Sequence, residues 1–112
     1  GTVEMCEQMN IFDFIEAPVR PGEWLQESRL GEEMTFDEIA QSVGKVIAID
    51  KSTQSHAWYK AVLVEKILER DEYDGRYRRL IYYDGTKQRG YISEMYFQVE
   101  GSRSYQRAWR IR

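Results

Sequence analysis

Few residues in this sequence have the types and the spacing that catalysis requires. His56 is the single histidine, and it stands in a polar stretch beside Ser55 with no evident acidic residue to orient its ring. Cys6 is the single cysteine, so neither a disulfide framework nor a zinc site built from several cysteines is expected. The glycine-rich motifs that cradle phosphates do not occur in the sequence either. We therefore expect a protein that is not an enzyme and that needs no cofactor or metal ion.

Basic residues gather instead in the second half of the chain, where tyrosines are interleaved with them. Lysine and arginine bind phosphate groups and aromatic rings stack on bases, so this pattern favours binding of DNA or RNA. If about four of these charges met phosphates of duplex DNA, log affinity should fall against log salt with a slope of roughly −3.6. One predicted hairpin carries Arg76, Arg78, Arg79, Lys87 and Arg89, and the C-terminal segment carries Arg103, Arg107, Arg110 and Arg112.

The two halves of the chain carry opposite net charge. Residues 1–50 contain 11 acidic and 3 basic residues, whereas residues 51–112 contain 8 acidic and 13 basic residues. The acidic half could attract a basic protein tail such as that of a histone, and the basic half could attract nucleic acid or an acidic protein. The plainer alternative is that the two halves pair with each other in the folded domain.

The composition is ordinary for one globular domain of 112 residues with one core, since 42% of the residues are hydrophobic and 31% are charged. Aromatic residues reach 13%, which suits a β-rich fold or a binding surface lined by rings. No apolar stretch has the length of a membrane-spanning helix, and no secretory signal is visible, so no membrane association is expected.

A short helix is predicted at 36–43. Thr35 and Glu38 have the spacing of a capping box, apolar residues follow at helical intervals, and Gly44 suits a left-handed C-terminal cap. Before the helix, the apolar cluster at 11–15 could be either a strand or a docking element. The segment 17–22 holds both prolines and must be extended or turning.

Five short strands are predicted after Gly44, at 46–49, 58–68, 76–83, 87–92 and 96–99. Asp74-Gly75 and Asp84-Gly85 are turn signals between them. So many short strands with small loops favour a small closed barrel over an open sheet, because closure hides the strand edges. Alternation at 105–111 is typical of a further strand that packs outside the barrel, although a flexible basic tail is the alternative.

Three short motifs follow one another in an order that is found in one known family. They are Gly44-Lys45-Val46-Ile47-Ala48, then Trp58-Tyr59-Lys60-Ala61-Val62, and then Leu80-Ile81-Tyr82-Tyr83-Asp84-Gly85-Thr86. The residues at 91–96 also fit the last hairpin and closing turn of that family. Through these motifs about half of the chain, from Gly44 to Val99, resembles a Tudor domain of the wider Tudor, agenet and chromo-barrel group.

The resemblance implies an SH3-like barrel that recognises methylated lysine or arginine in an aromatic cage. Ring faces attract the ammonium group, at about 0.5–2 kcal/mol per favourable contact. Matched by position, Tyr59 and Tyr82 are two cage rings and Asp84 is the acidic partner. Asp50 and Thr86 stand where the family has further aromatic residues, so the cage departs from the family pattern there. A third wall would have to come from one of the residues Trp58, Tyr83, Tyr91 and Trp24.

Taken together, the sequence predicts a mainly β protein with a small five-stranded SH3-like (Tudor-type) barrel at 44–100. An acidic N-terminal extension at 1–43, with its short helix, is expected to pack on the barrel, and a basic segment follows at 101–112. The expected function is recognition of a histone or other protein tail, methylated or not, by a chromatin-associated module in the nucleus or, alternatively, the cytoplasm. Nucleic-acid binding and a role as a protein–protein scaffold are the alternatives. In the plainest interpretation the tyrosines only pack the sheet, and Trp58 fills the core or a seam.

Overall fold

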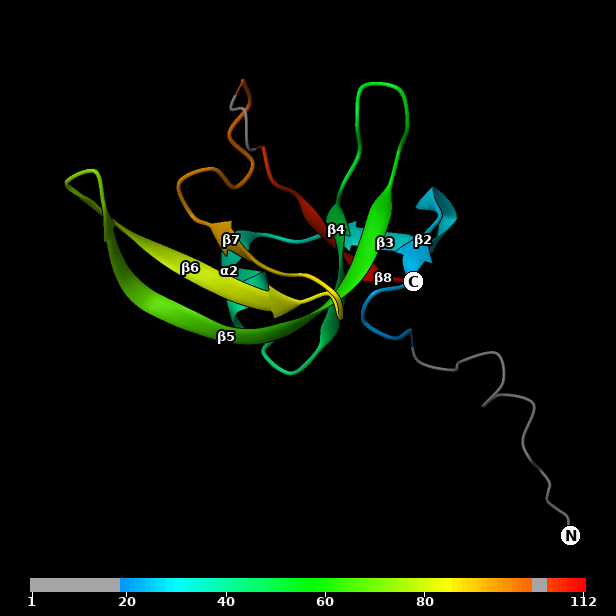
Figure 1. The fold of residues 1–112 in the computed structure, drawn as a ribbon, viewed down its shortest axis with the longest axis horizontal. Coiled ribbons are helices and arrows are strands. Elements are labelled where there is room, and N and C mark those ends of the chain that lie inside the picture. Colours follow the sequence, from blue (N-terminus) through cyan, green and yellow to red (C-terminus); the bar gives the residue numbers. More distant parts are fainter. Residues whose placement is uncertain (1–18, 102–104) are drawn as a thin grey trace, which may run out of the picture.

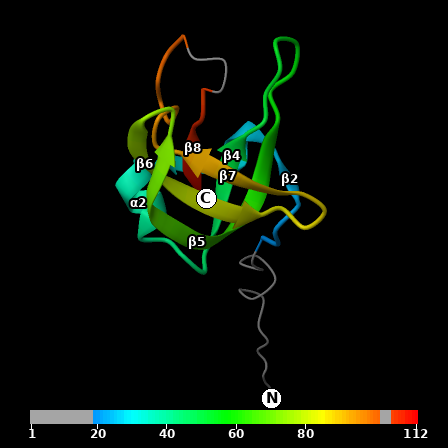
Figure 2. The same ribbon diagram turned by 60° about the vertical axis from the view of Figure 1, so that its left-hand side comes forward.

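The computed structural model describes residues 19–101 and 105–112, which have a mainly β fold (Figure 1). The strands form a 7-stranded antiparallel sheet in the order β3-β8-β4-β5-β6-β7, with β2 paired to β5 beside this path. The sheet is strongly curved (Figure 2), which is consistent with a small barrel-like fold. The elements are β2 (Trp24–Leu25), the 3-10 helix η1 (Glu27–Arg29), β3 (Leu30–Glu33), α2 (Phe36–Ala40), β4 (Val46–Asp50), β5 (Tyr59–Tyr73), β6 (Arg76–Asp84), β7 (Arg89–Ser93) and β8 (Ala108–Ile111).

Some of the sequence features discussed above lie outside the described residues. These are Cys6, the apolar cluster at 11–15, Pro18 and Arg103.

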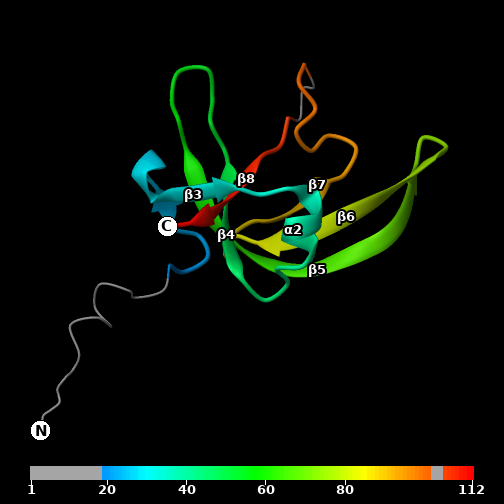
Figure 3. The same cartoon turned by 180° about the vertical axis from the view of Figure 1, so that it is seen from behind.

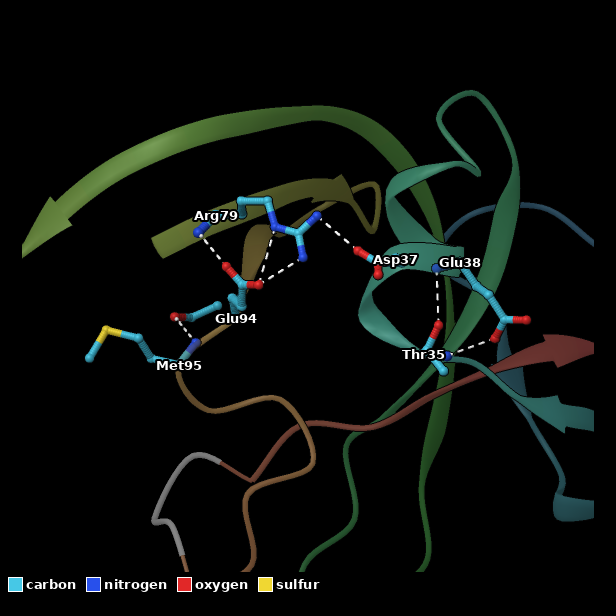
Figure 4. A network of polar contacts seen from close by, with 7 residues as sticks. Thr35, Asp37, Glu38, Arg79, Glu94 and Met95 are labelled. Carbon is cyan, nitrogen blue, oxygen red and sulfur yellow. Dashed lines mark hydrogen bonds and ion pairs between the residues drawn. The ribbon is translucent and has the colours of Figure 1, made fainter. Parts of the chain in front are cut away.

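Helix α2 begins at Phe36 because Thr35 caps it. The Glu38 N–H donates to Thr35 Oγ1 at 3.2 Å, and the Thr35 N–H donates to Glu38 Oε1 at 2.8 Å, so the predicted capping box is present (Figure 4). The helix ends at Ala40, earlier than the predicted position 43, and the chain continues in turns. Gly44 closes these turns with a φ of +89°, the left-handed conformation that glycine adopts without strain.

The main core lies on the face of the sheet against which α2 packs. Side chains alternate between the two faces of a strand, so every second residue of β4, β5 and β6 enters this core. The residues concerned are Ile47 and Ile49, Val62 and Val64, and Ile81 and Tyr83, with Phe36 and Ile39 from α2. On the other face, Leu25 of β2 and Trp109 of β8 pack with Ala48 and Ala61 in a second, smaller core. Figure 3 shows β3 and β8 beside β4.

Strands β5 and β6 form a long curved hairpin that extends away from the rest of the molecule (Figure 1). Its turn is at the predicted Asp74-Gly75, and both residues have positive φ, at 54° and 74°. The strand predicted to end at 68 continues to Tyr73. The reason is that its charged residues make cross-strand contacts: Asp71 pairs with Arg78, and the Arg70 guanidinium lies 3.8 Å from the centre of the Tyr77 ring.

The strand predicted at 96–99 is absent, and this prediction was wrong. After β7 the Ser93 carbonyl accepts from the N–H groups of Tyr96 and Phe97, each at 3.1 Å, and Gln98 has a φ of +59° that a strand does not allow. Phe97 is buried, and its ring meets the Phe36 ring at a centroid distance of 5.8 Å. The strand predicted at 105–111 is present as β8, but it does not pack outside the barrel. It lies within the sheet, between β3 and β4.

The acidic and basic halves of the chain contact each other directly, so the pairing that the sequence left open is present. Arg107 holds the Glu33 carboxylate with two hydrogen bonds, at 2.8 and 2.7 Å. Arg110 lies 3.4 Å from Glu38 in a looser pair. The Arg79 guanidinium of β6 contacts α2 and the turn after β7 (Figure 4): its nitrogens lie 2.8 Å from Asp37 and 2.7 Å from Glu94. The guanidinium carbon also lies 4.9 Å from the centre of the Phe36 ring.

These pairs predict how the stability depends on pH. Hydrogen bonds from Arg107 lower the pKa of Glu33, and hydrogen bonds from Arg79 lower the pKa of Glu94, both from an ordinary value of 4.5. A lowered pKa in the folded state gives stability that is present above 4.5 and is lost as the pH falls through the folded-state pKa. Urea unfolding should therefore show a free energy of unfolding that is flat from pH 7 to about 5 and falls below that. The E33Q variant should show a shallower fall, and an equally steep fall in E33Q would contradict this assignment.

Candidate ligand-binding surface

The structure does not bring Tyr59 and Tyr82, the two cage rings inferred from the family, together. Tyr59 is the first residue of β5, whereas Tyr82 pairs with Lys66, which is roughly 20 Å further along that strand at the usual rise per residue. The Tyr59 ring packs edge-on against Trp109 at 5.3 Å, as part of the second core. The Tyr82 ring faces Tyr91 at 6.4 Å. The two rings therefore do not form walls of one cage in this structure.

Tyr83 and Asp84 make contacts that stabilise the fold. Tyr83 is buried in the main core, and a side chain at the opposing Gly90 would place Cβ 2.5 Å from the Tyr83 hydroxyl, so only glycine fits there. The Lys51 ammonium donates to the same hydroxyl at 3.4 Å. Asp84 Oδ1 accepts from the Thr86 N–H at 2.8 Å and shapes the turn after β6.

That turn is covered by another segment of the same chain, residues 20–22. Thr86 Oγ1 donates to the Pro21 carbonyl at 3.1 Å, and Gly22 N–H donates to the Ala61 carbonyl at 2.7 Å. Gly22 has a φ of +96°, and a Cβ there would collide with Thr86 Oγ1. The loop that the resemblance assigns to the ligand is therefore partly covered by the N-terminal part of the described chain.

A pair of exposed tryptophans lies beside this turn. Trp24 of β2 and Trp58, just before β5, meet edge to face at a centroid distance of 5.4 Å and are 55% and 44% exposed. The His56 ring lies 5.8 Å from Trp58. Lys60, which pairs with Trp24 in the β2–β5 register, places its ammonium 5.3 Å from the centre of the Trp24 ring. We call Trp24, His56, Trp58 and Lys60 the aromatic end.

Trp58 was expected in the core or at a seam, and the structure places it in neither. It ends the loop between β4 and β5, where its carbonyl accepts from the Lys51 N–H at 2.8 Å and its N–H donates to Ser52 Oγ at 3.0 Å. These bonds fix the backbone of Trp58 in the loop, and its side chain remains exposed. Large apolar rings are usually buried, because burial contributes about 25 cal/mol for each Å² removed from water. Two neighbouring rings that stay half exposed are therefore the best candidate for a ligand-binding surface.

Most of the basic residues predicted to bind nucleic acid on the hairpin are held by acids. Arg78 is the most enclosed of them: its side chain is 9% exposed, and it also donates to Ser93 Oγ at 3.0 Å. Among the described residues, no ion pair involves Arg76 or Lys87, both of which are exposed. The pairs are Arg78 with Asp71 at 2.9 Å, Arg79 with Asp37 and Glu94, and Arg89 with Glu65 at 3.6 Å. Neighbouring carboxylates therefore neutralise most of the positive charges that the sequence places on the hairpin.

Within residues 19–101 and 105–112, no cluster of three or more histidine, cysteine, aspartate and glutamate side chains has an arrangement that could hold a metal ion. In the same part of the chain, no helix combines the length and the apolar character needed to cross a membrane. Comparison of the chain with models of protein families, with curated proteins and with solved structures found no match.

Proposed function

We propose that this protein is a non-catalytic, Tudor-like binding module that recognises a protein tail, such as a histone tail, at the aromatic end. The observation that carries this proposal is the pair of half-exposed rings, Trp24 and Trp58, contributed by two distant segments of the chain. Exposed tryptophans that pack against each other are typical anchors of binding surfaces, because they combine a large apolar area with little loss of side-chain freedom.

The Trp24 ring is able to bind a cation, as its contact with Lys60 shows. The Lys60 ammonium already lies 5.3 Å from the centre of the Trp24 ring, so this ring can attract a positive group. A lysine of a bound tail would make the same kind of contact with Trp24 or Trp58, and His56 would add a third ring. Methylation should strengthen the contact, since aromatic rings recognise quaternary ammonium groups well. Recognition of a methylated tail on chromatin is therefore the function that we infer, with the rings of the aromatic end in place of Tyr59 and Tyr82.

Replacing Trp58 by alanine should weaken binding of a trimethyllysine histone-tail peptide by tenfold or more. Truncation of a tryptophan anchor typically costs about 2 kcal/mol or more of binding free energy. The matched control is Y77A, because Tyr77 is 60% exposed but lies near the tip of the β5–β6 hairpin, and it should leave the affinity unchanged. Fluorescence anisotropy with the labelled peptide measures both, and circular dichroism checks that each variant is folded. Equal losses in W58A and Y77A would refute the aromatic end as the site.

Nucleic-acid binding at the same surface is the second candidate. Lys51 and Lys60 form no ion pair with the described residues, and Lys60 places its ammonium 5.3 Å from the centre of the exposed Trp24 ring. Cations beside stacking rings suit a single strand of nucleic acid, which needs both phosphate neutralisation and base stacking. This candidate shifts the interface away from Arg78 and Arg79, whose charges are paired. A scaffold that binds another protein elsewhere would be insensitive to changes at the aromatic end.

A further inference from the structure

The outer edge of β7 is closed along part of its length by one side chain. The Ser93 N–H donates to Gln106 Oε1 at 2.9 Å, and Gln106 Nε2 donates to the Tyr91 carbonyl at 3.1 Å. These are backbone groups that a neighbouring strand would use, so the amide of Gln106 takes the place of one residue of such a strand. The Ser93 carbonyl on the same edge is used as well, because it accepts from Tyr96 and Phe97.

The rest of this edge, at the start of β7, is open among the residues that the structure describes. Backbone groups of alternate residues in an antiparallel strand point to the same side, so those of Arg89 and Tyr91 face the same way as those of Ser93. Gly90 and Ile92 face β6 instead. Among the described residues, no hydrogen bond uses the Arg89 N–H, the Arg89 carbonyl or the Tyr91 N–H on this edge. Three backbone groups are therefore spaced for pairing with an extended chain, and Gln106 marks where that chain would stop.

The side chains around the open edge are mostly basic. Lys87 and Arg89 are exposed at its start, and the Arg89 side chain is 74% exposed with only a loose contact to Glu65 at 3.6 Å. Lys66 lies in the same cross-strand row as Tyr82 and Tyr91, with its ammonium 5.3 Å from the centre of the Tyr82 ring. Tyr91 is 49% exposed and offers an apolar surface beside the edge. The charge of this region would repel a basic tail and attract an acidic one.

We propose that the edge from Arg89 to Tyr91 is a second binding site, which takes an extended acidic peptide of a partner protein as an added β-strand. A residue opposite Arg89 would exchange two backbone hydrogen bonds with it, and the Tyr91 N–H would donate the third. Acidic side chains on the peptide would meet Lys87 and Arg89, which are the exposed basic residues at the edge itself. This site is separate from the aromatic end and does not depend on the function proposed for it.

The probe for this site is a short, end-capped, fluorescein-labelled peptide in which glutamate alternates with valine and threonine. The full chain should bind it, and the Tyr91 amide should become protected from hydrogen exchange. Y91P removes the N–H on the open edge without removing a bond to β6, and Y91T keeps that N–H as the matched control. We expect Y91P to weaken binding by about tenfold and Y91T to change it by less than about threefold. R89E should also weaken binding, whereas W58A should leave it unchanged.

Several results would overturn the proposal. One is a lysine version of the peptide binding as tightly as the glutamate version, and another is Y91P and Y91T binding equally. Protection of the Tyr91 amide that rises with protein concentration alone would show that a second copy of the chain takes the edge instead. If Y91P does not fold, the exchange measurement on the unchanged protein decides, and a Tyr91 amide that gains no protection from the peptide refutes the site.

Discussion

The I81A variant should lose about 2–5 kcal/mol of the free energy of unfolding. Ile81 is fully buried in the middle of β6, and its register partners are Ile67 on β5 and Ile92 on β7. Shortening it leaves a cavity in the main core that the paired strands cannot close, so both the transfer energy and the packing contacts are lost. A domain of this size is typically stable by about 5–15 kcal/mol, so the loss is a large fraction of the total.

Urea unfolding followed by circular dichroism measures this loss. The matched control is L68A, because Leu68 belongs to the same hairpin but is 40% exposed. The control should cost less than about 1 kcal/mol, as surface changes usually do. Similar losses at Ile81 and Leu68 would contradict the placement of the core between α2 and the sheet.

The K60Q variant should shift the affinities for the two candidate ligands in opposite directions. If the protein binds a methylated tail, removal of the Lys60 ammonium frees the Trp24 ring and removes repulsion between two cations. The peptide affinity should then rise by about three- to tenfold. This is the effect expected when the ligand gains a cation–π contact with Trp24 and no longer meets the screened repulsion of Lys60. If the protein binds nucleic acid, the same change removes a cation that could neutralise a phosphate. Affinity should then fall, and the salt slope should decrease by about 0.7 for a single strand.

Anisotropy titrations of K60Q with a trimethyllysine peptide and with a labelled single-stranded oligonucleotide give both numbers. K45Q serves as the control, since Lys45 is an exposed lysine near the start of β4 and outside the aromatic end. A peptide affinity that falls in K60Q would count against the tail hypothesis, and an oligonucleotide affinity that is unchanged would count against the second candidate.

Local signals in the sequence predicted much of the fold. The capping box at Thr35, the positive φ at Asp74 and Gly75, and the β-branched run of β4 each depend on neighbouring residues, and each is present as expected. The mainly antiparallel β architecture follows from such signals because alternation and turn residues are set within short windows.

The remainder depends on contacts between distant residues. Residues 69–73 are charged and look like a loop, yet they extend β5 because their partners lie across the hairpin. Phenylalanine is common in strands, and this favours the strand predicted at 96–99. In the structure the Phe97 ring packs in the core against Phe36, and residues 96–99 form no strand. β2 has only two residues, which is too short for a strand pattern to appear in the sequence. Its pairing with β5, and the contact between Trp24 and Trp58 that depends on this pairing, could therefore not be predicted.

The aromatic end could be inferred only in part. The sequence predicts Trp58 and Trp24 only as candidate third walls of the cage. Their mutual contact depends on the segment 20–24 folding back on β5, where Gly22 and Ala61 form a backbone hydrogen bond. The ion pairs of the basic hairpin could not be predicted, because they depend on tertiary structure. The acids that hold Arg78 and Arg79 come from β5, α2 and the turn after β7.

The most direct test of the central claim is an amide- and indole-resolved NMR titration of the labelled protein with matched unmodified and trimethyllysine histone-tail peptides. If a tail binds at the aromatic end, the signals of Trp24 and Trp58 should shift on titration, the shifts should spread to His56 and Lys60, and they should grow with methylation. Spectra of the folded protein that stay unchanged with both peptides, or shifts that leave Trp24 and Trp58 untouched, would contradict it.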